Sequence, residues 1–134
     1  MLFDVDLITY RGKYKTVQTE KINFLSTDGR RTILSNHMPI IIPLEPGVIE
    51  TNNNGILSHY VVSEGMLYFE NNHGKIVCDL IEDIDTVDID YYEARINDAN
   101  EKLSIARSDA DIKKATIQLT RATNVIRAAK KTRN

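Results

Sequence analysis

The sequence predicts an α+β protein in which an N-terminal antiparallel β-sandwich is followed by a C-terminal antiparallel two-helix hairpin. All six glycines and all three prolines of the 134 residues lie before residue 75, where short alternating apolar runs are separated by turn signals. That texture is typical of an antiparallel sandwich or barrel. After residue 88 the apolar residues recur at steps of three and four, which is the spacing of one helical face. We therefore expect a β-sandwich domain over residues 1–85 and an α-helical hairpin over residues 88–134.

Strands of the first domain are expected where apolar residues alternate with polar ones. Phe3, Val5 and Leu7 alternate in this way before a turn at Arg11-Gly12. Runs of asparagine with glycine at 52–55 and 71–74 are residues that tight hairpin turns favour. Together these signals predict further strands at 21–24, 48–51, 56–62, 66–70 and 75–80.

Two helices are predicted in the second domain. Asp90 is expected as the N-cap of the first helix, with Glu93 completing a capping box, and Ser108 with Asp111 marks the start of the second. The first apolar stripe comprises Tyr92, Ile96, Ala99, Leu103 and Ala106. The second comprises Ile112, Ala115, Leu119, Ala122, Ile126 and Ala129. Because many of these side chains are small, the hairpin should bury little apolar area and be able to move or to bind.

Composition and charge exclude several functional classes. With 17 basic and 19 acidic residues the formal net charge is -2, which argues against a protein that mainly coats nucleic acid. Cys78 is the single cysteine, fits a reducing compartment, and is expected to be a small buried side chain. The apolar run at 38–44 is far shorter than the ~20 residues of a membrane helix. Neither a membrane helix nor a signal peptide is expected, so the default location is the cytosol.

Motifs for catalysis or metal binding are not recognised. His37, His59 and His73 fit no metal-ligand or nucleophile spacing, so packed or solvent-facing roles are expected. The acidic run 82–85 lacks the glycine and the spacing of a calcium loop, and is expected to be a solvated linker. We therefore expect a protein that is not an enzyme and has no metal site.

Residues 27–40 form the segment most suggestive of a binding role. The segment contains a turn, a short strand and a polar loop that precedes an apolar run bounded by prolines. One interpretation is a loop that only crosses between sheets. The other is a recognition loop in which Arg30, Arg31 and His37 lie at one end of the sandwich, since loops on rigid scaffolds commonly carry recognition residues.

Charge is unevenly distributed along the second domain. Nine acidic residues and a single basic one, Arg95, lie between Asp79 and Glu101, whereas the end of the chain is basic. Matching of charges to helix dipoles is one explanation. Docking of a basic helix end on an acidic protein surface is the other, and nucleic acid is less favoured because the tail offers no aromatic stacking partner. The basic residues are Arg121, Arg127, Lys130, Lys131 and Arg133.

The order and spacing of several segments resemble the epsilon subunit of the bacterial F-type ATP synthase over nearly the whole chain. The segment from Val62 to Leu67, Val-Ser-Glu-Gly-Met-Leu, is similar to the family's Val-Ser-Gly-Gly-Phe-Leu. Ile89-Asp90 opens a helical half of matching order and length. The other matching segments are Phe3 to Thr9, Gly29 with Ile33-Leu34 and Asn36 to Ile40, and Leu44 to Ile49.

This resemblance implies a sandwich of about ten strands in the central stalk of the rotor, without catalytic activity. In the family the sandwich binds the gamma subunit and stands on the c-ring, at the cytoplasmic face of the membrane. The helices either fold against the sandwich or extend to an acidic loop of the catalytic beta subunits, and the extended form blocks ATP hydrolysis. The implied contacts to gamma and the c-ring are Asp28, Gly29, Arg30, Arg31, Asn36, His37 and Met38. Those to beta are Arg121, Arg127, Lys130 and Lys131.

Two departures from the family pattern change these expectations. Arg30-Arg31-Thr32 stands where the family commonly has Glu, a small apolar residue and Gly, so the partner ring should be acidic there. Some members also bind ATP through Ile/Leu-Asp-x-x-Arg-Ala, but here Glu93 replaces the arginine and would repel a triphosphate. Weak or absent ATP binding and no cofactor are therefore expected. The residues of the degenerate motif are Ile89, Asp90, Lys114 and Arg121, whereas Val125 falls where a further arginine is expected.

A second hypothesis is a free-standing adaptor, with a peptide-binding sandwich and a basic helix that binds nucleic acid. Co-purification separates the two, because the adaptor predicts salt-sensitive retention of nucleic acid and the rotor subunit predicts gamma and the c-ring. An enzyme is the third and least favoured hypothesis, for want of a catalytic constellation.

Overall fold

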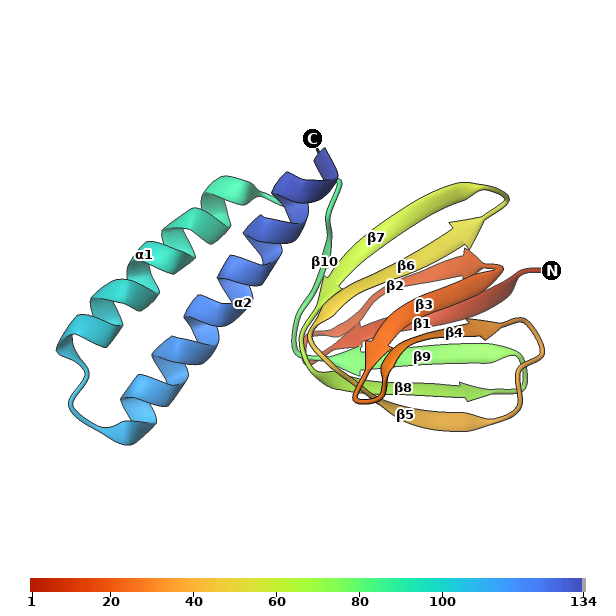
Figure 1. Cartoon of the computed structure of the whole chain (residues 1–134), viewed down its shortest axis with the longest axis horizontal. Helices are drawn as coiled ribbons and strands as arrows, with labels where there is room; N and C mark the ends of the chain where they lie inside the picture. Colours follow the sequence, from red (N-terminus) through yellow and green to blue (C-terminus); the bar gives the residue numbers. More distant parts are fainter. Residues whose placement is uncertain (134) are drawn as a thin grey trace. The chain divides into compact units, whose positions relative to one another are not determined.

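The computed structural model describes residues 1–133 and divides the chain into two units, Met1–Asp83 and the residues from Ile84 onward (Figure 1). Asn134, the last residue of the predicted hairpin domain, lies outside the described residues. The predicted fold class is confirmed, because ten strands are followed by two helices in the described residues. The elements are β1 (Phe3–Thr9), β2 (Gly12–Thr19), β3 (Lys21–Ser26), β4 (Gly29–Leu34), β5 (Ile40–Leu44), β6 (Gly47–Asn53), β7 (Ile56–Val62), β8 (Gly65–Glu70), β9 (His73–Cys78), β10 (Ile81–Asp83), α1 (Ile89–Ile105) and α2 (Asp109–Arg133).

The ten strands curl into a nearly closed sandwich (Figure 1). Their order is β10-β7-β6-β3-β5-β8-β9-β1-β2, and β4 pairs with β3 outside this path. Among the described residues the pairings are antiparallel except that of β1 with β9, which is parallel with Val5 opposite Gly74. This parallel pair is the exception in a sandwich that is otherwise antiparallel, as predicted. A parallel pair needs a long connection, which here is supplied by all the intervening strands.

Three strands were not expected from the sequence. Most side chains of β2 are exposed, so the strand lacks the alternation that marks one buried face. Pro43 lies within β5, which pairs along its length with β8 but meets β3 only at Leu44, and proline is tolerated where one strand edge is free. The supposed linker at 82–85 begins inside β10, since Ile81–Asp83 pairs with β7.

The interior of the sandwich is filled by the inward residues of the strands. Phe3, Val5 and Leu7 of β1 are buried, as their alternation predicts, and so are the inward residues of β3. Phe69 lies centrally, with its ring 5.2 Å from that of Phe3 in an edge-to-face arrangement. The largest fully buried side chains of this unit include Phe24, Phe69, Leu7, Ile22, Ile33, Ile49, Leu67 and Ile76.

The two helices begin at side-chain caps, one of which was predicted correctly. The Ser108 hydroxyl accepts a hydrogen bond from the Asp111 amide at 3.1 Å, as expected. At the first helix the N-cap is Asp88, whose carboxylate accepts from the Tyr91 amide at 3.1 Å. The prediction of Asp90 as N-cap is wrong, because the extended backbone that a cap requires occurs at Asp88, and Asp90 already lies in the first turn.

Small residues form much of the buried surface of the hairpin, as the two stripes predicted. Ala106 departs from its stripe, because α1 ends at Ile105 and Ala106 is its extended C-cap. Ile112 also departs, since 44% of it is exposed near the start of α2. The buried helical residues are Tyr92, Ala99, Ala115, Ala122, Val125, Ile126 and Ala129.

We expect Phe69→Ala to lower the free energy of unfolding by about 3–5 kcal/mol, because it leaves a cavity in the sandwich interior. The matched control is Tyr68→Ala, which truncates the neighbouring ring on the outer face of the same strand and should cost far less. Urea unfolding of the chain followed by circular dichroism measures both. Equal losses for the two variants would contradict the assigned strand register.

Candidate functional site

Strand β4 separates the predicted contact residues into two groups. Asp28 and Gly29 lie at the turn between β3 and β4, whereas Asn36 to Met38 follow the opposite end of β4. A six-residue strand spans roughly 20 Å at about 3.3 Å per residue. The expectation that Arg30, Arg31 and His37 share one end of the sandwich is therefore wrong. Both arginines lie in β4, the short strand expected within residues 27–40, and not in the polar loop that carries His37.

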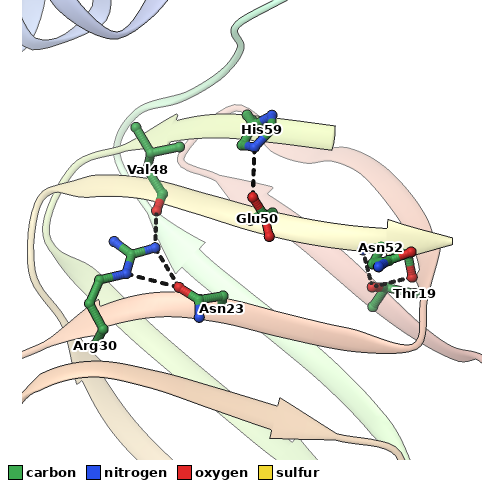
Figure 2. A network of polar contacts seen from close by, with 7 residues as sticks. All are labelled: Thr19, Asn23, Arg30, Val48, Glu50, Asn52 and His59. Carbon is green, nitrogen blue, oxygen red and sulfur yellow. Dashed lines mark hydrogen bonds and ion pairs between the residues drawn. The ribbon is translucent and has the colours of Figure 1, made fainter. Parts of the chain in front are cut away.

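Arg30 is anchored across the outer face of two strands, as Figure 2 shows. Its Nε and Nη2 donate to the Asn23 carbonyl oxygen Oδ1 at 2.9 and 2.5 Å, and Nη2 also donates to the Val48 carbonyl at 3.2 Å. Arg31 is exposed, and within the described residues its side chain makes no hydrogen bond or ion pair. Of the two arginines, Arg31 is therefore the one available to an acidic partner.

The other polar residues on this side of the sandwich are bonded to one another. His59 of β7 and Glu50 of β6 lie directly opposite, with Nε2 2.8 Å from Oε2 (Figure 2). Thr19 donates through its hydroxyl to the Asn52 carbonyl at 3.2 Å and accepts from the Asn52 amide at 2.9 Å. His59 thus has a cross-strand partner, in keeping with the structural role expected for it.

The turn that carries Asn36, His37 and Met38 is held by the neighbouring turn. Asn36 has a left-handed backbone with φ 68°, and its amide donates to the side-chain oxygen of Asn72 at 2.7 Å. The His37 ring meets Phe69 edge-on at 6.1 Å, and its Nδ1 donates to the Met38 carbonyl at 2.7 Å. Met38 is left exposed on a turn with a fixed shape.

A second surface, which the sequence analysis missed, is the outer face of β5, β8, β9 and β1. Ile41 lies opposite Tyr68, and these residues are 63% and 40% exposed. Val77, at 38% exposure, lies beside Met66 in the next row. The signal for this surface is that these strands carry apolar residues at outward as well as inward positions. We name it the apolar face, and it consists of Ile8, Ile41, Pro43, Met66, Tyr68 and Val77.

Paired charges border the apolar face. Asp6 accepts from the Thr16 hydroxyl, and its other carboxylate oxygen lies 3.0 Å from His73 Nε2. These donors, with Lys13 at 3.4 Å, lower the pKa of Asp6 to about 2. Asp6 is therefore a carboxylate at neutral pH, and His73 has a structural partner.

The basic residues of the helical hairpin have different environments. Arg127, Lys130 and Lys131 are exposed, whereas Arg121 is half-buried. The side chain of Arg133, which belongs to the predicted basic end, lies outside the described residues. The exposed set could meet an acidic surface without first leaving a buried site.

The residues of the degenerate nucleotide motif are spread along the hairpin. Ile89 and Asp90 open α1, and Lys114 lies near the start of the antiparallel α2. Gln118 marks the register, because it bonds to α1 between Arg95 and Asp98. At about 1.5 Å per residue, Asp90 and Lys114 are then separated by roughly 15 Å along the hairpin. The hairpin as folded therefore keeps Lys114 apart from Ile89 and Asp90, whereas the same register brings Arg121 level with Glu93, about one turn from Asp90.

The described residues were also examined for a reactive thiol, a metal-binding cluster and a membrane-spanning helix. Cys78 is buried, and burial raises the pKa of its thiol to about 11, so the thiolate nucleophile is scarce at neutral pH. In the described residues no group of three or more His, Cys, Asp or Glu side chains is arranged to hold a metal ion. No helix among residues 1–133 combines the length and the apolar character needed to cross a membrane.

Comparison with known proteins finds relatives that match the chain through both the sandwich and the helices. Residues 2–84 match the family model described as ATP synthase, Delta/Epsilon chain, beta-sandwich domain. The chain is 30% identical over 132 residues to the ATP synthase epsilon chain of Lactobacillus delbrueckii subsp. bulgaricus, covering 93% of this chain and 90% of that one. It is 28% identical over 134 residues to the epsilon chain of Herpetosiphon aurantiacus, covering 100% and 98%.

Solved structures show the same fold. A chain of the Euglena gracilis mitochondrial ATP synthase, in a structure of OSCP, F1 and c-ring, aligns with a TM-score of 0.66 at 18% identity, covering 99% of this chain and 82% of that one. A chain of the Tetrahymena thermophila mitochondrial ATP synthase, in a structure of the central stalk and c-ring, aligns with a TM-score of 0.57 at 16% identity, covering 98% and 96%.

Proposed function

This chain belongs to the family of ATP synthase epsilon chains, non-catalytic subunits of the central stalk, and from this premise we propose that its sandwich couples gamma to the c-ring while its helices restrain ATP hydrolysis. The observation that carries the proposal is the match to epsilon chains through both the sandwich and the helices. No cofactor and no nucleic acid are required for this role. The chain would lie at the cytoplasmic face of the membrane, held there by the complex.

We assign the apolar face to the gamma subunit. A contiguous exposed apolar surface marks a protein interface, and permanent interfaces are the more apolar ones. Ile41 and Tyr68 form one row of it, beside the row that includes Met66, and the paired charges around Asp6 form a polar border. A stalk subunit that turns with the shaft needs such a permanent contact, and Asn36, His37 and Met38 would extend it at the end of the sandwich.

The turn at Asp28-Gly29 is assigned to the c-ring. Gly29 has φ +110°, and the Ser26 hydroxyl donates to its carbonyl at 2.9 Å, so the turn has a defined shape. Arg31 supplies the unpaired cation beside it, and Arg30 supplies an anchored one. Acidic residues in the ring loops would complement both charges and orient docking.

The basic end of α2 is assigned to the catalytic beta subunits. Arg127, Lys130 and Lys131 are exposed and offer three cations to an acidic loop. Arg121 would join them only after the helices rearrange, because it is half-buried here. Complementary charge supports docking of the helices in the state that blocks hydrolysis.

The apolar-face assignment predicts that Ile41→Glu reduces recovery of gamma in co-purification by about tenfold or more, since an unpaired buried carboxylate costs well over the 1.4 kcal/mol that a tenfold loss represents. Ile56→Glu is the matched control, because Ile56 is exposed at the β6–β7 turn, away from the apolar face. Unchanged recovery of gamma with Ile41→Glu would contradict the assignment of the apolar face to gamma.

Removal of residues 88–134 should raise ATP hydrolysis by the reconstituted complex severalfold, because the proposed inhibitory helices are then missing. Full-length Arg127→Glu/Lys130→Glu should raise the rate in the same direction by repelling the acidic loop. Phosphate release measures both. If the rate stays the same in both variants, the helices do not restrain hydrolysis, although the coupling role is unaffected.

ATP should bind the isolated chain weakly or not at all. Glu93 stands where the motif has arginine, and Lys114 is far from Asp90 in the folded hairpin. Isothermal titration with ATP should therefore give no saturable heat below the millimolar range. A sub-millimolar dissociation constant would refute this prediction.

A further inference from the structure

One polar cluster joins the two helices and takes no part in the contacts proposed above. The Gln118 side-chain amide of α2 donates to the Arg95 carbonyl at 3.1 Å and to the Asp98 carboxylate at 2.9 Å, both on α1. The same Asp98 oxygen pairs with Lys102 at 3.0 Å, and Lys102 also donates to the Gln118 side-chain oxygen at 3.4 Å. These three side chains, Gln118, Asp98 and Lys102, are named the clamp.

Apolar packing is weak in the half of the hairpin near its turn. Between residues 95 and 118 the buried helical residues are Ala99 and Ala115, each of which contributes a single methyl group. Of the larger apolar residues near the turn, Ile105 is 75% exposed, Ile112 is 44% exposed and Leu103 is only half-buried. Because burial of apolar area scales with side-chain size, this half receives little hydrophobic stabilisation. Polar contacts between the helices therefore carry more weight here than in a leucine-rich seam.

The hydrogen bonds of the clamp satisfy its charged groups. The Gln118 amide and then Lys102 lower the pKa of Asp98, so the carboxylate is ionised whenever the hairpin is folded near neutral pH. A hydrogen bond to a charged group stabilises more than one between neutral groups. Gln118 is the only member of the clamp on α2, so closure between the helices depends on its amide.

We propose that the clamp holds the turn-proximal half of the hairpin closed and that loss of the Gln118 amide opens it. Because the bonds are made entirely by side chains and backbone of this chain, closure needs no bound nucleotide. The next step rests on the proposed function. A closed clamp favours the folded hairpin over the extended arrangement of the helices that blocks ATP hydrolysis. A ligand-free clamp of this kind would make the balance insensitive to ATP concentration.

The test is amide hydrogen exchange of the full-length chain, compared among variants of α2. Gln118→Glu keeps the length of the side chain but replaces its donor by a carboxylate that faces Asp98, and exchange at 99–117 should accelerate about tenfold or more. Thr120→Glu is the matched control, since it adds the same charge at an exposed position of α2. Asp98→Asn in the Gln118→Glu background should restore slow exchange, because the amide and the carboxylate have changed places.

The outcomes distinguish failure of the proposed clamp from failure of the proposed inhibition of ATP hydrolysis by the helices. Unchanged exchange at 99–117 in Gln118→Glu overturns the clamp, and so does equal acceleration throughout the sandwich or with Thr120→Glu. Faster exchange confined to the hairpin supports it. In the reconstituted complex Gln118→Glu should then lower ATP hydrolysis. If exchange accelerates but hydrolysis does not change, the clamp stands and inhibition by the helices fails.

Discussion

Alternation along the strands is the constraint on which the sandwich and its surfaces depend. Inward residues such as Phe24 and Phe69 fill one shared interior, so every outward residue has its position fixed by the same register. A shift by one residue would exchange buried and exposed side chains. Because the inward residues fix the register, the outward residues on the two outer surfaces can differ in polarity without changing the fold. One carries polar groups bonded to each other around Glu50 and His59, and the other carries the exposed apolar face around Ile41.

The hairpin is held together by different interactions from those that stabilise the sandwich. Alanines at positions such as Ala99 and Ala115 allow the helices to approach but bury little area, so packing alone gives a small preference for the closed form. Gln118 and Asp98 add directional bonds whose loss can shift that preference. A few kcal/mol between two arrangements is enough for a switch. A stable platform and a weakly closed hairpin suit the role proposed above, in which the sandwich stays attached to the stalk while the helices move.

Much of the fold could be predicted because it follows from local pattern, and the failures have physical causes. β1, β3 and the two asparagine-rich hairpins alternate clearly, whereas β2 is mostly exposed and β5 contains Pro43, so neither shows that pattern. Aspartate is a favoured N-cap residue at position 88 and at position 90, so only the backbone conformation decides between Asp88 and Asp90. The division of the contact residues by β4 and the apolar face both depend on strand pairing. The clamp depends on the register between helices, which the spacing of apolar residues does not specify.

Rotation with the shaft is the central claim, and a cross-linking measurement tests it most directly. Cys78 is buried, so Ile41→Cys provides an accessible thiol on the apolar face. A disulfide from that position to a cysteine on gamma should form in high yield and leave ATP-driven proton pumping intact, because both partners turn together. Loss of pumping when this disulfide forms, restored by reduction, would mean that the two surfaces move past each other and would contradict the account.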